Sequence, residues 1–194
     1  MPKGLSGKKM IERYLSTNFG GPFTPIDPSQ FKTLSGAEGM IKSRAVEHLV
    51  VFDDISKQAI VAGYGSSSSV GVPGGVDYTG KTVTHNHPGI YGGTLSFADV
   101  TFATGYNVKS MRAVGANKKE GTYILRKGRN ANPTGLNSRI AKDRPMLERK
   151  MTAVYNKHKD KTTVFFAQEY TGILDSYYKS VVSQYGYVYA KQGD

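Results

Sequence analysis

The chain contains no cysteine among its 194 residues. The absence of thiols excludes disulfides, iron–sulfur clusters, thiolate zinc sites and cysteine nucleophiles. Histidine and carboxylate side chains are the strong metal ligands that remain, and the sequence has only four histidines. Any transition-metal site in this protein must therefore be built from a small set of residues.

Long apolar runs are also missing. Near the expected core the longest run is Leu-Val-Val-Phe at residues 49–52, far short of the roughly 20 residues that span a bilayer. The basic amino-terminal segment contains Met-Ile-Glu-Arg-Tyr-Leu at residues 10–15, which is too short and too charged for the apolar region of a signal peptide. We therefore expect a soluble protein with no membrane contact that is not exported by the usual secretory route.

Acidic residues are scarce relative to basic ones, with 15 Asp or Glu against 26 Lys or Arg and a net charge of +11. The excess is concentrated between Arg126 and Lys161, where eleven Lys or Arg face three Asp or Glu. Such a basic segment suits nucleic acid or an acidic protein surface as a partner. A solvated helix face that binds nothing is an equally simple interpretation.

The length suits one well-buried core with appendages. We divide the chain into a glycine- and proline-rich arm at residues 1–40, a central domain at 41–128 and a basic helical extension at 129–194. In the arm, residues 8–17 favour a short helix, whereas residues 31–40 are compatible with a loop or a helix. In the extension, we expect a loop at 128–137 and two amphipathic helices.

Apolar periodicity and turn residues predict the elements of the central domain. We expect a hairpin of strands at 46–53 and 58–62, a strand at 81–85, a helix at 96–104, and strands at 109–115 and 121–126 joined by a turn at 116–120. The glycine- and serine-rich segment at 63–75 reads as a flexible loop. It can fold over a cleft or form a plain surface excursion.

The two carboxy-terminal helices are marked by apolar residues at helical spacing. The first carries Leu147, Met151, Val154 and Tyr155 on one face, and Pro145 suits its first turn. The second carries Phe166, Tyr170, Ile173, Leu174, Tyr177, Val181 and Tyr185. We expect this tyrosine-rich stripe to pack onto the domain or a partner, with base stacking as the lesser alternative.

One stretch carries residues suited to metal chemistry. Side chains at positions i and i+2 of a strand point to the same face, so His85 and His87 can present two imidazoles to one point. After a glycine-rich bend, Ser96-Phe-Ala-Asp99 has the pattern of a capping box at a helix start. The Asp99 carboxylate can return to the strand as a third ligand. Two His, one Asp and an open position are the composition of a catalytic zinc site.

With Glu47 upstream, the pattern His85-Asn-His87-Pro88 and then Ser96-Phe-Ala-Asp99 resembles the JAB/MPN domain with its JAMM motif, a glutamate followed by His-x-His and Ser-x-x-Asp. The resemblance covers about residues 44–127 and is greatest to the JAB-like domains of bacterial and phage proteins, in particular those of phage head-assembly proteins. It implies an α+β, sandwich-like fold with a mixed β-sheet and flanking helices. It also implies a phage-encoded protein, located in the cytoplasm of a bacterial host or in the virion.

The resemblance further implies a mechanism. His85, His87 and Asp99 would hold Zn²⁺, Glu47 would take a proton from water and pass it to the leaving amine, and Ser96 would bond the oxyanion. The reaction would be hydrolysis of a peptide or isopeptide bond in a peptide or protein substrate.

A second hypothesis comes from a different class of function. It is a structural or packaged virion protein whose JAB-like domain serves as a scaffold, while the segment from Arg126 to Lys161 contacts DNA or neighbouring capsid or tail subunits. The remaining histidines support neither hypothesis. We expect His48 to point away from Glu47, because it is the next residue on the strand, and we place His158 on a basic helix.

Overall fold

The computed structural model describes residues 7–88, 93–116 and 121–192. The strands are β1 (Thr24–Pro25), β2 (His48–Phe52), β3 (Ala59–Tyr64), β4 (Thr82–His87), β5 (Ser110–Gly115), β6 (Thr122–Lys127) and β7 (Tyr187–Gln192). The α-helices are α1 (Gly7–Leu15), α2 (Leu34–Ile41), α3 (Phe97–Gly105), α4 (Pro133–Lys157) and α5 (Thr163–Val181), and two short 3₁₀ helices are η1 (Pro28–Gln30) and η2 (Val182–Tyr185). None of the helices in this part of the chain is long and apolar enough to cross a membrane.

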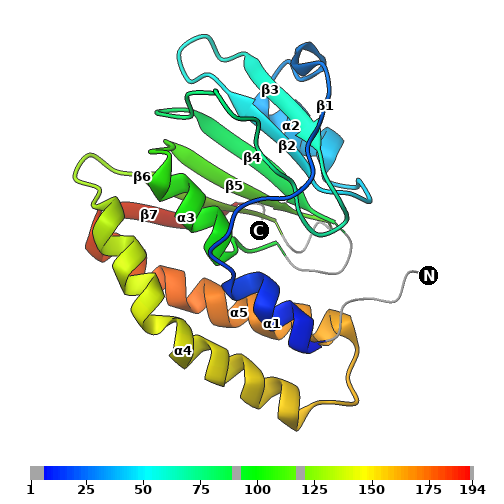
Figure 1. Cartoon of the computed structure of the whole chain (residues 1–194), viewed down its shortest axis with the longest axis vertical. Helices are drawn as coiled ribbons and strands as arrows, with labels where there is room; N and C mark the ends of the chain where they lie inside the picture. The colour runs from blue at the N-terminus through cyan, green and yellow to red at the C-terminus, as the bar shows by residue number, and fades with distance from the viewer. Residues whose placement is uncertain (1–6, 89–92, 117–120, 193–194) are drawn as a thin grey trace.

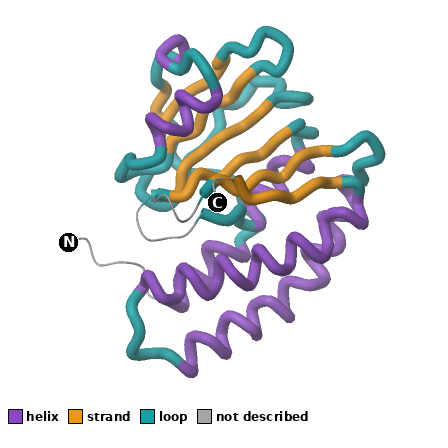
Figure 2. Tube along the Cα trace, turned by 180° about the vertical axis from the view of Figure 1, so that it is seen from behind, coloured by secondary structure: helices purple, strands orange, loops and turns teal. Residues whose placement is uncertain are grey.

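The seven strands form one mixed sheet in the order β1-β3-β2-β4-β5-β6-β7, which confirms the predicted α+β class. Helices α1, α3, α4 and α5 gather on one side of the sheet, and α2 packs on the other (Figures 1 and 2). The central strand β4 runs antiparallel to β2 and parallel to β5. A parallel pair needs a crossover, and α3 provides it between β4 and β5. The start of α3 therefore follows the carboxyl end of β4, a strand in which every residue is buried.

A single large hydrophobic core joins the three predicted segments of the chain. Its buried members include Met10 and Leu15 from the arm, Leu49 from the central domain, and Tyr170 and Tyr178 from the extension. A smaller cluster on the opposite face of the sheet packs α2 against β2 and β3. Residues 1–40, 41–128 and 129–194 thus fold around the same core, and the arm and the extension each add a strand to the sheet.

The local predictions for residues 7–127 agree with the observed elements. The helix expected at 8–17 is α1, and the hairpin expected at 46–62 is β2 and β3. The segment left open at 31–40 contains α2, whose N-cap hydroxyl, Thr33 Oγ1, accepts a hydrogen bond from the Gly36 N–H at 3.1 Å. Of the turn expected at 116–120, residues 117–120 lie outside the described residues.

The predictions for the extension were partly wrong. Helix α4 begins at Pro133, inside the predicted loop, because Asn132 Oδ1 caps it by accepting from the Gly135 N–H at 2.8 Å. Pro145 lies in the middle of this helix rather than in a first turn. The helix continues past the proline because Ile140 and Leu147, on either side of it, are both buried.

The end of the chain was also misread. We predicted only helices after residue 137, but α5 ends at Val181, Tyr185 lies in η2, and the chain then adds β7 to the sheet beside β6. The apolar stripe of α5 packs onto the domain, as the first of the two predicted alternatives requires. Its buried members are Phe166, Tyr170, Leu174, Tyr177 and Val181.

Candidate metal centre

Strand β4 presents His85 and His87 on one face. Both side chains are buried, and their Nε2 atoms lie 3.0 Å apart with ring centroids at 4.8 Å. Pairing with β2 and β5 on either side fixes the strand, since His85 lies opposite Leu49 and Ala113. The predicted convergence of two imidazoles on one point is therefore present.

Helix α3 brings the third side chain to this point. Ser96 is its N-cap, and its Oγ accepts from the Asp99 N–H at 3.2 Å, while Asp99 Oδ2 accepts from the Ser96 N–H at 2.7 Å. This reciprocal capping box holds the carboxylate in place. Asp99 Oδ1 lies 3.2 Å from His85 Nε2, and Asp99 Oδ2 lies 3.7 Å from His87 Nε2. The strand and the helix start thus form one buried cluster.

The spacing of these atoms fits a metal ion. Tetrahedral zinc with bonds of about 2.0–2.1 Å has its ligand atoms about 3.3–3.4 Å apart. The two Nε2 atoms here lie 3.0 Å apart, Asp99 Oδ1 lies 3.2 Å from His85 Nε2, and Asp99 Oδ2 lies 3.7 Å from His87 Nε2. One ligand atom from each of the three side chains lies within 4.8 Å of the other two. Within the described residues, His85, His87 and Asp99 are the one group of three such side chains that can hold an ion. The cluster is therefore a candidate metal centre.

The ionisation of the cluster follows from burial and charge. Burial alone would lower the pKa of His85, but the Asp99 carboxylate outweighs it and raises the pKa above the usual 6.5. Burial likewise disfavours the charged form of Asp99, yet His85 holds the pKa of that carboxyl well below its usual range. Without metal, His85 as the proton donor is thus coupled to the ionised Asp99 carboxylate. A metal cation that displaces the proton of His85 finds a carboxylate that is already ionised.

A cavity of about 230 Å³ opens beside the cluster. Glu47, His87, Ser96 and Asp99 line it, and His85 lies beneath them in contact with His87 and Asp99. The rest of the wall comes from Ala98 of α3 and from two segments that carry no motif, the arm and the glycine- and serine-rich loop. The arm supplies Arg13, Tyr14, Ser16, Asn18, Phe19 and Gly20, and the loop supplies Ser68, Ser69 and Val70.

No known family is matched by this chain. Comparisons with protein-family models, curated proteins and solved structures found no match. The interpretation of the cavity therefore rests on the chemistry of its side chains and on the motif that brings them together.

Glu47 is held in the cavity wall by its backbone. Its N–H donates to Ser66 O at 2.7 Å, and its carbonyl accepts from the Gly65 N–H at 2.8 Å. The side chain is buried and forms an ion pair with Arg13 of α1. Burial raises the pKa of Glu47 to about 6, although the Arg13 guanidinium opposes the shift. A carboxylate with such a pKa can both accept and release a proton near neutral pH.

Asn86, between the two histidines, ties the segment around Glu47 to β4. Its side chain points away from the histidine face; its Oδ1 accepts from the His48 N–H at 2.6 Å, and its Nδ2 donates to Val46 O at 3.3 Å. Because Glu47 lies between these two bonded residues, Asn86 fixes Glu47 relative to His85 and His87. The sequence offered one signal for this role, a polar residue at the buried centre of a strand.

The loop at 63–75 forms part of the cavity wall, the first of its two predicted alternatives. Ser66 Oγ accepts from the Ser68 and Ser69 N–H groups at 3.2 and 3.1 Å, which closes a tight turn. Only glycine fits at position 65, because an added Cβ would lie 2.1 Å from Ser69 O. The turn therefore holds Ser69 and Val70 against the cavity.

Ser96 lines the cavity, but its hydroxyl is already engaged, because Oγ donates to Asp99 Oδ2 at 2.8 Å. Donation to an oxyanion requires that this proton be redirected.

The other two histidines lie away from the cavity walls. His48 Nδ1 donates to Val46 O at 3.0 Å and its ring packs on Tyr64, and His158 ends α4 beside Phe165.

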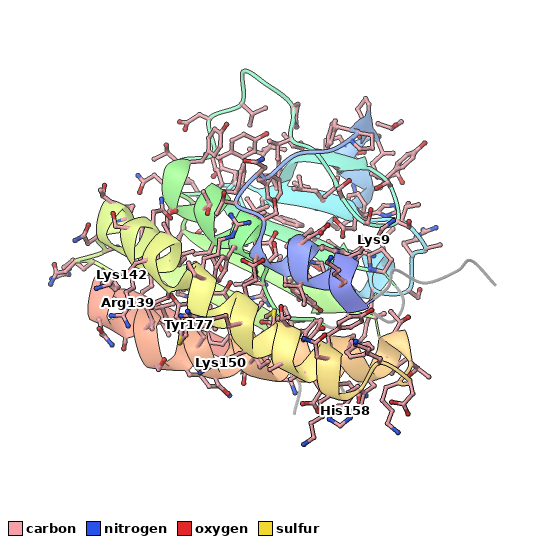
Figure 3. All side chains as sticks on the ribbon, turned by 60° about the horizontal axis from the view of Figure 1, so that its bottom comes forward. Lys9, Arg139, Lys142, Lys150, His158 and Tyr177 are labelled. Atoms are coloured by element: carbon pink, nitrogen blue, oxygen red, sulfur yellow. The ribbon has the colours of Figure 1, made fainter. Side chains whose placement is uncertain are left out.

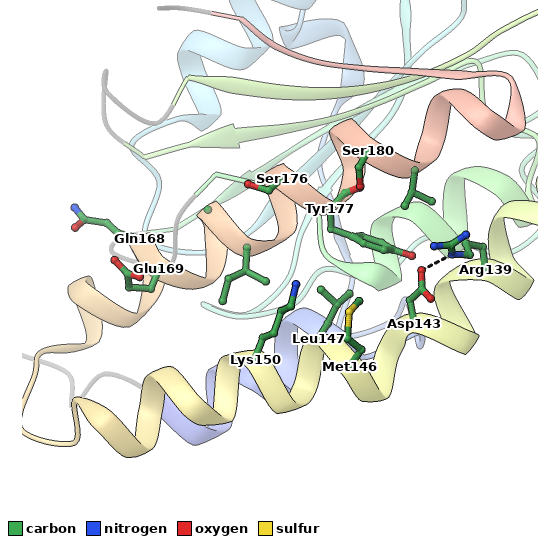
Figure 4. A pocket seen from close by; sticks show the side chains of 13 residues that line it. Arg139, Asp143, Met146, Leu147, Lys150, Gln168, Glu169, Ser176, Tyr177 and Ser180 are labelled. Atoms are coloured by element: carbon green, nitrogen blue, oxygen red, sulfur yellow. Dashed lines mark hydrogen bonds and ion pairs between the residues drawn. The ribbon is translucent and has the colours of Figure 1, made fainter.

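A larger hollow of about 620 Å³ lies between α4 and α5 (Figure 4). Arg139 and Asp143 form an ion pair within it, and Lys150 and Glu169 line its other end. None of the predicted site residues lines this hollow. Both acidic and basic side chains line this hollow, and they do not form a group of metal ligands. The smaller cavity is therefore the better candidate for a functional site.

Proposed function

We propose that this protein is a zinc-dependent peptidase of the JAMM type that hydrolyses a peptide or isopeptide bond. One observation carries the proposal: three buried ligand atoms converge on the wall of a cavity that also holds a buried carboxylate, Glu47. A structural zinc site is closed by four protein ligands, whereas three ligands leave a position for water or substrate. The ligand set beside an accessible cavity thus favours catalysis.

The residues take separate roles in this proposal. His85, His87 and Asp99 would hold the metal, and a bound zinc ion would supply Lewis-acid polarisation of the scissile carbonyl and a lowered pKa for water near neutral pH. The Glu47 carboxylate accepts the proton of that water and returns it to the leaving amine. The Ser96 hydroxyl turns from Asp99 to donate to the oxyanion.

The decisive experiment separates the base from the ligands. Purified protein should contain one zinc ion per chain near neutral pH and cleave members of a panel of peptides and isopeptide-linked substrates. Glu47→Gln should keep its zinc, because Glu47 is not a ligand, yet lose about 10²–10⁴-fold in rate. Glu148→Gln, an exposed glutamate on α4, is the matched control and should behave as wild type. Zinc-free protein, or full activity in Glu47→Gln, would contradict the proposal.

A second candidate function rests on helix α4. Arg139, Lys142, Arg149, Lys150 and Lys157 fall within about 100° of its circumference, at 100° per residue, and span about 27 Å. Figure 3 shows Arg139, Lys142 and Lys150 following the length of this helix. Such a stripe suits the phosphates of nucleic acid and favours a packaged phage protein that contacts DNA.

The second function is tested by binding and by location. Duplex DNA should bind with an affinity that falls steeply with salt, and the protein should occur in purified phage particles at a fixed copy number. Reversing two charges of the stripe, Lys142→Glu with Arg149→Glu, should abolish binding without loss of zinc. Absence from particles together with failure to bind DNA at low salt would exclude this function. The two functions are compatible, since a virion can carry a peptidase, and both are consistent with a location in the host cytoplasm or the virion.

A further inference from the structure

The amino-terminal helix α1 is fixed to the body of the protein. Its apolar residues Met10, Ile11, Tyr14 and Leu15 are buried in the main core, and the helix lies against α4 and α5 (Figures 1 and 3). At its first residue, Gly7, an added Cβ would lie 2.8 Å from the Phe166 ring and 2.9 Å from the Tyr155 ring. The approach is therefore close enough to require glycine, and α1 cannot move without opening this packing.

Arg13 extends from this fixed helix into the candidate site. Its side chain is 17% exposed, lines the cavity, and donates from Nη2 to Glu47 Oε1. Glu47 is 34 residues further along the chain and lies at the start of a different layer of the fold. The contact thus joins the helical layer, which the carboxy-terminal helices hold in place, to the carboxylate beside the metal ligands.

We propose that Arg13 is a positioning residue for Glu47, so that the amino-terminal arm is part of the catalytic site. The inference rests on the proposed peptidase function. The guanidinium engages Oε1 and fixes the orientation of the carboxylate relative to the metal ligands. It also provides the positive charge that a buried carboxylate needs to stay ionised.

The packing of α1 argues against the opposite role, that of a removable inhibitor. A lid that releases Glu47 must leave the cavity, but Arg13 lies between Tyr14 and the buried turn of Met10 and Ile11. Withdrawal of Arg13 by movement of the helix would expose that apolar face to water. The contact is therefore a permanent part of the site, and its removal should slow the reaction.

Three variants test this role. Arg13→Met should lower kcat by about tenfold to a hundredfold, with zinc content unchanged, because Arg13 is not one of the metal ligands. Arg13→Lys keeps the positive charge and should restore part of the loss. Lys8→Met removes an exposed charge from the same helix and should leave kcat unchanged.

A measurement that needs no catalytic activity separates failure of the inference about Arg13 from failure of the proposed function. In zinc-free protein, urea unfolding of Arg13→Met, Glu47→Gln and the double variant should show coupling of about tenfold in the unfolding equilibrium constant. Additive effects, or a kcat of Arg13→Met equal to or above that of wild type, would overturn the inference. If the zinc-loaded wild-type protein cleaves no substrate, the proposed peptidase function fails. If Arg13 and Glu47 are still coupled in unfolding in that case, their ion pair is a structural contact and not part of a catalytic site.

Discussion

The sharpest consequence of the buried cluster concerns Asp99→Asn in the metal-free protein. Asparagine keeps the shape of the side chain, and its amide oxygen can still accept from the Ser96 N–H. It cannot balance a positive charge on His85. The substitution therefore tests the charge of Asp99 with little change in packing.

The size of the effect depends on pH. The pKa of His85 is raised above 6.5 by Asp99, so the stability contributed by the pair is fully present below 6.5 and is lost as pH rises through the folded pKa. Removing one partner of a buried ion pair costs about 3–5 kcal/mol, and this is the loss expected at about pH 5.5. At a pH above the folded pKa of His85, where the imidazole is neutral, only a weakened hydrogen bond remains to be lost, at about 1 kcal/mol.

Urea unfolding with a chelator present, at about pH 5.5 and at a pH above the folded pKa of His85, which NMR titration of the imidazole locates, measures both losses. Asp160→Asn, which changes an exposed carboxylate, is the control and should show no loss at either pH. An equal loss at the two pH values, or a larger loss at the higher one, would refute the assignment of an ionised His85–Asp99 pair.

Three further predictions concern the same site. Zinc binding should release a proton, and the affinity for zinc should rise with pH through the raised pKa of His85. Calorimetry in buffers of different ionisation enthalpy measures the number of protons released. No proton release would mean that the ion binds elsewhere. Asn86→Ala should cost about 1–3 kcal/mol of folding stability for each group left unpaired, and should slow hydrolysis while zinc is retained; unchanged kcat would mean that Asn86 does not position Glu47. Gly65→Ala should lower stability by more than about 1 kcal/mol and slow hydrolysis, because its Cβ would meet Ser69 O; a neutral effect would show that the turn is not held as described.

The two halves of the candidate metal centre were predictable because each is local. Strand alternation places His85 and His87 on one face, and a capping box fixes Asp99 three residues after Ser96 at a helix start. What spacing did not supply is the distance between strand and helix. That distance follows from the crossover of α3 between two parallel strands.

The rest of the site depends on contacts between distant segments. Arg13 reaches Glu47 because an apolar helix face finds its place on α4 and α5, and no pattern within the first 40 residues specifies that partner. The strand β7 was missed because the helical period of the tyrosines ran on to Tyr185. Gly186, with a φ of 73°, ends that helical region, and it was the available signal for a change of structure.

The central claim is that His85, His87 and Asp99 hold one catalytic zinc ion. Crystals of zinc-loaded protein, measured on both sides of the zinc absorption edge, test it most directly. We predict one anomalous peak about 2.0–2.2 Å from the two Nε2 atoms and an Asp99 oxygen, facing the cavity that Glu47 lines. No peak at this position, or a peak bound by other residues, would contradict the claim.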